Sequence, residues 1–168
     1  RLGGDQRGEL MIRNELTGHY RKTGEREKSL ESASESIRLL KELEMEDTVS
    51  AGTSYVNAAT AYQAFGEPEK ALTLFEEARR VYESIPDVQP QLLGGLYNNM
   101  ALALSALRRF REAESLWQKA MEQMSRVPSG ALEQAITCLN MANAVEDEAG
   151  LTEGEPRIYE LLDRAEAL

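Results

Sequence analysis

At 168 residues, with 42% hydrophobic residues, five prolines and three phenylalanines, the chain is long enough for one domain with a buried interior, and its composition favours a soluble helical protein over a β-sandwich or barrel. The 19 Lys and Arg against 29 Asp and Glu give a formal net charge of -10, which disfavours nucleic acids and anionic membranes as partners. One cysteine, Cys138, and one histidine, His19, exclude an internal disulfide and a zinc cluster, so no metal or other cofactor is predicted.

The chain has no run near the roughly 18 consecutive apolar residues of a membrane span, and residues 1–4 do not resemble a signal peptide. A cytoplasmic setting is therefore predicted. The chain begins without Met and stops at Ala167-Leu168 inside a predicted helix. We therefore expect it to be a segment of a longer protein.

Apolar residues recur at intervals of three and four, which is the spacing of a helix face. In chain order they predict four two-helix units, at residues 10–47, 52–87, 94–127 and 136–168. A constant 42-residue offset aligns these units, as expected of a helical repeat. The aligned columns are Arg13/Tyr55/Tyr97/Leu139, Leu16/Ala58/Met100/Ala142, Tyr20/Tyr62/Leu104, Ser29/Ala71/Ala113, Ala33/Phe75/Trp117 and Ser36/Ala78/Ala120.

The break between the helices of a unit is marked by glycine. Gly24, Gly66 and Gly150 share one column, in which Arg108 is the exception. Glycine tolerates the left-handed conformation that ends a helix, and the proline of Gly66-Glu67-Pro68 suits the first turn of the next one. Each unit is therefore predicted to be a tight helical hairpin.

One hairpin cannot bury its apolar face alone, so the four are predicted to stack. The expected fold is all-α, a right-handed superhelical solenoid of about four antiparallel hairpins that forms a single domain over residues 1–168. The first helix of each hairpin should line its concave side.

The segment from Tyr97 to Ala101 and the segment Arg109-Phe110-Arg111-Glu112-Ala113-Glu114-Ser115-Leu116-Trp117-Gln118-Lys119-Ala120 together resemble a tetratricopeptide repeat, as does the stretch from Tyr55 to Ala78. The 42-residue period is longer than the usual ~34, and it resembles the variant found in kinesin light chains and in bacterial scaffold and sensor proteins. The outer units fit less well: Arg13 and Ala33 replace larger apolar residues, and Glu155 falls in a small-residue column. Either these are capping repeats or the register slips after Gly150, with Ala165 as the displaced small residue.

The resemblance implies a peptide-binding groove lined by residues between the core columns. Those positions are Asn14, Arg21, Lys22, Asn57, Gln63, Asn98, Asn99 and Asn140. An amide side chain both donates and accepts, so a row of amides can hold the backbone of an extended peptide. Asn57 and Asn99 share one column, and in related repeats such an Asn binds a peptide, whereas the fourth unit has Met141 there.

Two alternatives stay open for these residues. The amides can instead bridge neighbouring helices, and the charges can form an ordinary solvated face. If the charges do serve the groove, Arg21 and Lys22 would make one end cationic and Asp147 and Glu148 the other end acidic, which would orient a peptide.

No enzyme is predicted, because His19 has no partnered nucleophile or carboxylate at a diagnostic spacing. Trp117 lies at core spacing, Cys138 is expected to be partly buried, and Glu146-Asp147-Glu148 lacks the spacing of a calcium loop. The predicted function is a protein–protein interaction module that binds a peptide or protein segment, as a scaffold or as the sensor part of a bacterial regulator. The alternative is a structural element for self-association into homo-oligomers.

Overall fold

The computed structural model describes residues 5–168, except for the side chains of residues 150–153 and 155. The described chain is all helical, with α1 (Gln6–Lys22), α2 (Arg26–Glu42), α3 (Val49–Ala64), α4 (Pro68–Ser84), α5 (Pro90–Ala106), α6 (Phe110–Ser125) and α7 (Ala131–Glu166). It divides into two compact units, Arg1–Val88 and Gln89–Leu168. The single domain over residues 1–168 remains a prediction.

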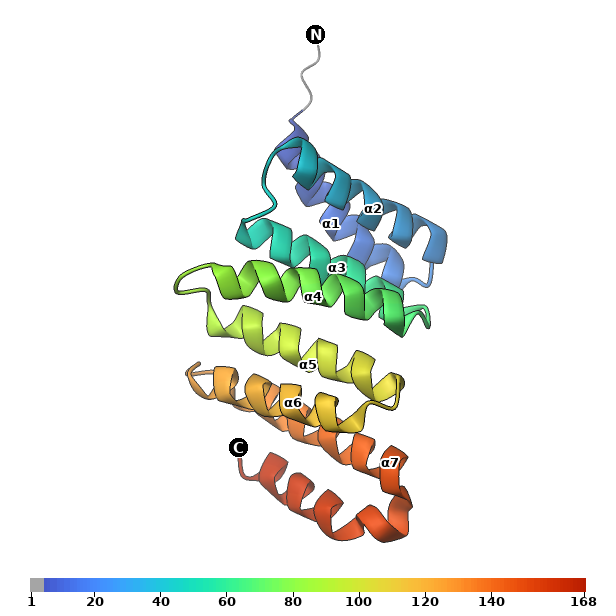
Figure 1. The fold of residues 1–168 in the computed structure, drawn as a ribbon, viewed down its shortest axis with the longest axis vertical. Helices are drawn as coiled ribbons and strands as arrows, with labels where there is room; N and C mark the ends of the chain where they lie inside the picture. Colours follow the sequence, from blue (N-terminus) through green and yellow to red (C-terminus); the bar gives the residue numbers. More distant parts are fainter. Residues whose placement is uncertain (1–4) are drawn as a thin grey trace. The chain divides into compact units, whose positions relative to one another are not determined.

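In the first unit, α1 packs against α2 and α3 packs against α4 (Figure 1). The second pair stacks on the first because α3 also contacts both α1 and α2. Short loops join the helices of each pair, at residues 23–25 and 65–67, so the two helices of a pair run antiparallel. The predicted all-α fold of consecutive antiparallel pairs is confirmed.

The predicted glycine turns end α1 and α3. Gly24 and Gly66 both have a φ of 77°, and Arg108 takes the same left-handed conformation at 58°. After each of these residues a backbone N–H donates back to a carbonyl of the Tyr20/Tyr62/Leu104 column, from Glu25 at 2.8 Å, from Glu67 at 2.9 Å and from Arg109 at 2.9 Å. This bond closes a Schellman-type helix end. The three reversals are therefore one repeated structure.

Replacing Gly66 by alanine is expected to lower the free energy of unfolding by about 1 kcal/mol, because a left-handed backbone costs a residue with a Cβ roughly 1–2 kcal/mol. Gly18→Ala is the matched control: Gly18 lies inside α1 with open space around it, so alanine should stabilise by about 0.5–1 kcal/mol. Urea unfolding measures both. Equal effects of the two substitutions would contradict the assigned turn.

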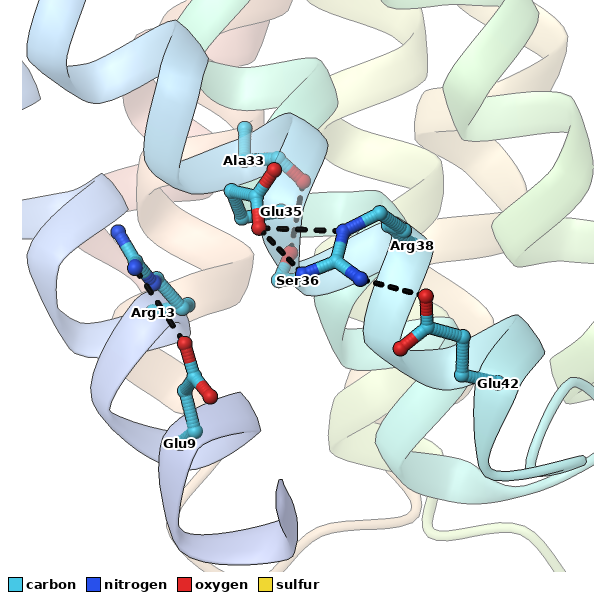
Figure 2. Close-up of polar contacts among 7 residues, drawn as sticks. All are labelled: Glu9, Arg13, Ala33, Glu35, Ser36, Arg38 and Glu42. Atoms are coloured by element: carbon cyan, nitrogen blue, oxygen red, sulfur yellow. Dashed lines mark hydrogen bonds and ion pairs between the residues drawn. The ribbon is translucent and has the colours of Figure 1, made fainter. Parts of the chain in front are cut away.

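The small-residue columns are buried in the first unit. Ala71 and Ala78 are fully buried. Ser29 and Ser36 hold the same columns in the first pair, and Ser29 Oγ donates to the Thr17 carbonyl of α1 at 2.9 Å. Ser36 Oγ donates to the Ala33 carbonyl of its own helix at 2.8 Å (Figure 2). A buried hydroxyl is thereby accommodated without a loss of hydrogen bonds.

Partly exposed ion pairs lie along both helices of the first pair. Figure 2 shows Arg38 between Glu35 and Glu42, with nitrogen-to-oxygen distances of 2.7 and 2.5 Å. Arg13 stands in the column of Tyr55 and Tyr97, and its guanidinium pairs with Glu9 at 3.3 Å. Exposed pairs one helical turn apart contribute little stability. Their effect is to keep the surface of this pair polar.

In the second unit, α5 packs against α6, and α7 contacts both of them. Although α7 is assigned as one 36-residue helix, Arg164 lies close enough to Cys138 to affect its thiol, whereas a straight helix would separate these residues by about 39 Å. A Cβ added to Gly154 would likewise lie 2.9 Å from Val145 Cγ1. The helix therefore folds back into two arms, as Figure 1 shows, and completes a fourth antiparallel pair.

The reversal of α7 differs from the predicted one. Gly150 lies within the helical backbone and does not end a helix as Gly24 and Gly66 do. The 42-residue register is lost beyond it: Tyr159 would share the column of Phe75 and Trp117 yet is 58% exposed, while Leu161 is buried. The register thus slips after Gly150. The side chain of Glu155, expected in a small-residue column, lies outside the described residues.

Candidate functional site

A recess of about 250 Å³ lies between α1 and α3, the first helices of two consecutive pairs. We call it the α1–α3 recess. Its walls combine amides, a carboxylate and exposed apolar groups, and they consist of Leu10, Met11, Asn14, Glu15, Val49, Ser50, Thr53 and Asn57. Two of the predicted groove residues, one from each helix, are thus brought to the same recess.

Asn14 ties the two helices together. Its Nδ2 donates to Ser54 Oγ at 2.8 Å, and that hydroxyl donates in turn to the Ser50 carbonyl at 3.0 Å. The amide oxygen Oδ1 is buried and has no hydrogen-bond partner among the described residues. A buried acceptor without a partner costs roughly 1–3 kcal/mol. Asn14 therefore bridges helices, as the alternative interpretation holds, and its amide oxygen is a buried acceptor without a partner.

Asn57 is half-buried on the α3 wall. Within the described part of the chain its side chain makes no hydrogen bond, so both its donor and its acceptor remain available. The helix around it is anchored by Ala58 and Ala61, which are fully buried on the adjoining face of α3. Asn57 has the features expected of a residue that binds a ligand and is not needed for the fold.

The second unit has a comparable recess of about 240 Å³ between α5 and the first arm of α7. We call it the α5–α7 recess. It is lined by Leu102, Ser105, Ala106, Asn140, Asn143, Ala144 and Asp147. Asn140 Nδ2 donates to Asn98 Oδ1 at 3.1 Å, a pair separated by the 42-residue period itself. These two amides bridge neighbouring first helices, as Asn14 does.

The other predicted groove residues line neither recess: Arg21, Lys22, Gln63, Asn98 and Asn99. Arg21 and Lys22 lie in the last turn of α1. Asn57 and Asn99 share a column but belong to different units. The structure thus groups Asn14 with Asn57, and Asn98 with Asn140.

Several recess residues were not singled out from the sequence. Glu15 could have been found, since it stands in the column of Asn57 and Asn99, and Asn143 follows Asn140 by one helical turn. Met11 and Val49 gave no such signal. They are exposed apolar side chains at the recess, which only the packing of α1 beside α3 reveals.

The reactive residue types lie elsewhere. His19 is exposed and makes an edge contact with the Tyr20 ring at 5.5 Å between ring centroids. Cys138 is fully buried, more than expected, and burial raises the pKa of its thiol, which stays protonated at neutral pH.

Among the described residues there is no group of three or more His, Cys, Asp or Glu placed to hold a metal. None of the helices described has the length and apolarity needed to cross a bilayer.

Antiparallel helix pairs that recur with one constant period define a helical-hairpin repeat protein of the solenoid class. The chain belongs to the tetratricopeptide repeat family: models of that family match residues 9–84 and 94–122, together more than half of the chain. No curated protein sequence matches it significantly.

Solved structures show the same fold at low sequence identity. BtubC (BKLC) from P. vanneervenii is 16% identical, with a TM-score of 0.80 over 94% of this chain and 63% of BtubC, so the chain spans under two thirds of that relative. A Podosopora anserina protein assigned as a kinesin light chain, with nearly identical TPR-like repeats, is 20% identical, with a TM-score of 0.70 over 94% of this chain and 74% of its own. A substituted form of that protein is 19% identical, with a TM-score of 0.73 over 94% and 73%. The predicted likeness to kinesin light chain-type repeats is confirmed at the level of fold.

Proposed function

We propose that the chain is a protein-interaction module that holds an extended polypeptide segment in the α1–α3 recess. Tetratricopeptide repeat domains generally bind proteins, and the observation that supports a site here is the convergence of Asn14 and Asn57 from two successive first helices. The unused amide of Asn57 can donate to and accept from the alternating C=O and N–H groups of a peptide backbone. A scaffold or sensor role in the cytoplasm of a bacterium belongs to the same proposal.

The recess also supplies apolar contacts and a charge. Met11 and Val49 are exposed at its walls and suit aliphatic side chains of the peptide, while Glu15 favours a basic residue beside them. Further along α1, Arg21 and Lys22 would attract an acidic end of the segment. The expected ligand is thus an extended segment with an apolar centre and charges of opposite sign at its ends.

Replacing Asn57 by alanine is expected to weaken peptide binding at least tenfold. Two hydrogen bonds to the peptide backbone would be lost, and a tenfold change in Kd corresponds to about 1.4 kcal/mol of binding free energy. The peptides would be selected from a displayed random library on the immobilised chain, and their Kd measured by calorimetry. Thermal stability should not fall, since Asn57 makes no hydrogen bond within the described chain and alanine favours a helix more than asparagine does.

Gln118→Ala serves as the control, because Gln118 is an exposed amide on α6 outside both recesses. The double variant Asn57→Ala with Asn99→Ala extends the test to the equivalent position of the second unit. If selected peptides bind the single and the double variant as tightly as the unchanged chain, the amide site is refuted.

Self-association is a second candidate function, favoured by the exposed apolar residues of α1 and α7. Ile12 is 60% exposed, although Ser54 and Cys138 of the same column are fully buried. Leu132, Ile136 and Leu139 form an exposed stripe along the first arm of α7. The charges are complementary: α1 has four basic residues against two acidic ones, whereas residues 129–168 have two against nine.

If copies join through these surfaces, light scattering should show a mass that rises with protein concentration and falls with salt, and Ile12→Asp should hold the chain at monomer mass. Ile12 is exposed, so this substitution leaves the fold intact. A monomeric mass for the unchanged chain over a wide concentration range would exclude self-association.

A further inference from the structure

A crevice of about 280 Å³ lies between α2, α3 and α4, and it shares no lining residue with the α1–α3 recess. We call it the α2–α4 crevice. Its apolar walls are Ala33 and Ile37 from α2, Ala58 and Tyr62 from α3, and Leu74 from α4. Small-molecule sites are mainly apolar and begin at about 300 Å³. The crevice is therefore close to the lower limit for such a site.

The crevice borders a position at which the first pair has a small residue and the next two pairs have an aromatic ring. Ala33 stands in the column that holds Phe75 and Trp117 in the next two pairs, and those rings are 0% and 2% exposed. In the second unit, the cavity beside Trp117 has only about 20 Å³. The larger crevice thus lies beside the position that has the smaller side chain, as expected of close packing around a ring in the other pairs.

The polar edge of the crevice is cationic. Lys70 lines it and forms an ion pair with Glu67, which also pairs with Arg26. This cluster has two cations against one carboxylate, although the chain as a whole is strongly acidic. An ammonium has three donors, so Lys70 can bind Glu67 and a second carboxylate together.

The backbone around the crevice does not suit an extended peptide. Its lining residues lie inside helices, where the N–H and C=O groups are bonded within the helix. The hydroxyls of Ser34 and Thr73 donate to the carbonyls of Leu30 at 2.9 Å and Glu69 at 3.1 Å. A main chain would find no ladder of partners here, which favours a small molecule over a polypeptide.

We propose that the α2–α4 crevice binds a small aromatic carboxylic acid. The ring occupies the space that Phe75 and Trp117 fill in the other pairs, against Ala33, Ile37 and Leu74. The carboxylate binds the ammonium group of Lys70. This site is independent of the proposed peptide site, and such a ligand would act on α2, α3 and α4 together.

The probe is 2-naphthoate, titrated into the ¹⁵N-labelled full chain and followed by ¹H–¹⁵N NMR. Saturable shifts are expected at the amides of Ser34, Ile37, Thr73 and Leu74, with half-saturation in the millimolar range or below, as expected for a ligand of this size. The neutral analogue 2-naphthylmethanol should bind at least threefold more weakly. Shifts confined to other parts of the chain, such as the exposed stripe of α7, would overturn the proposal.

Ala33→Phe should weaken naphthoate binding at least tenfold, because the new ring fills the crevice. If this variant is unstable, Ala33→Leu, which adds less volume, should weaken binding by a smaller factor. Equal affinity for a folded Ala33 variant and the unchanged chain would refute the site.

Lys70→Met should weaken naphthoate binding at least threefold and abolish the preference over the neutral analogue. Lys28→Met is its matched control: Lys28 holds the same position one repeat earlier, pairs with Glu25, and lies over the Tyr20 ring as Lys70 lies over Tyr62, but it does not line the crevice. Equal effects of the two lysine substitutions would show that the carboxylate is not bound by Lys70.

Discussion

Phe75→Ala is expected to lower the free energy of unfolding by about 4 kcal/mol. The Phe75 side chain is fully buried in α4, and truncation to alanine removes its contacts and leaves a cavity. The loss would show as a lower midpoint of urea unfolding with an unchanged slope. A change below about 1 kcal/mol would contradict the buried position of this ring.

The reverse substitution, alanine to phenylalanine, at the equivalent position of the first pair should raise the free energy of unfolding. Ala33→Phe fills the α2–α4 crevice, and filling a cavity commonly stabilises a protein by about 0.5–2 kcal/mol. Opposite signs at Ala33 and Phe75 would agree with the assignment of both positions to one column of the repeat. Destabilisation by both would show that the crevice cannot accept a ring.

Gly52→Ala is expected to lower the free energy of unfolding by about 2 kcal/mol, although alanine favours a helix by roughly 1 kcal/mol over glycine. A Cβ at this position would lie 2.1 Å from Cε1 of Tyr82. The ring cannot easily move away, because it is buried and its hydroxyl is hydrogen-bonded to Thr53 Oγ1 at 3.0 Å. Gly52 is therefore required for the close approach of α3 and α4.

Gly94 holds the position of Gly52 one repeat later and is the matched control. A Cβ there would lie 2.7 Å from Cε, 3.2 Å from Sδ and 3.1 Å from Cγ of Met124, an unbranched and flexible side chain that can adopt another rotamer. Gly94→Ala should therefore change the free energy of unfolding by less than about 1 kcal/mol. Thermal unfolding of both variants would test the difference, and an equal loss at the two glycines would contradict the role given to Tyr82.

The repeat and its turns were predictable because each depends on a local property of the residues. The conformational freedom of Gly24 and Gly66, and the alternation of Ala71 and Ala78 with Phe75, are visible in sequence spacing alone. Arg108 was not predictable as a left-handed residue from its type, only from its place in the glycine column. The repeat thus indicated a left-handed turn at Arg108 that the residue type alone did not indicate.

The last reversal and the grouping of the site residues depend on packing between helices. The helical backbone of α7 continues through Gly150, so the turn column fails there and Tyr159 becomes exposed. The sequence also treats Asn57 and Asn99 as equivalent, but only Asn57 shares a recess with a second predicted amide, Asn14. The spacing of residues in the sequence predicts which face of a helix a residue lies on. Which residue lies opposite it across the recess depends on how the neighbouring helix packs.

The α1–α3 recess is tested most directly by NMR mapping of a library-selected peptide on the ¹⁵N-labelled chain. The proposed function predicts that the perturbed amides cluster on α1 and α3 around Asn14 and Asn57, and that the side-chain amide signals of both residues shift on binding. Perturbations confined to α2 and α4, or to the second unit, would contradict it.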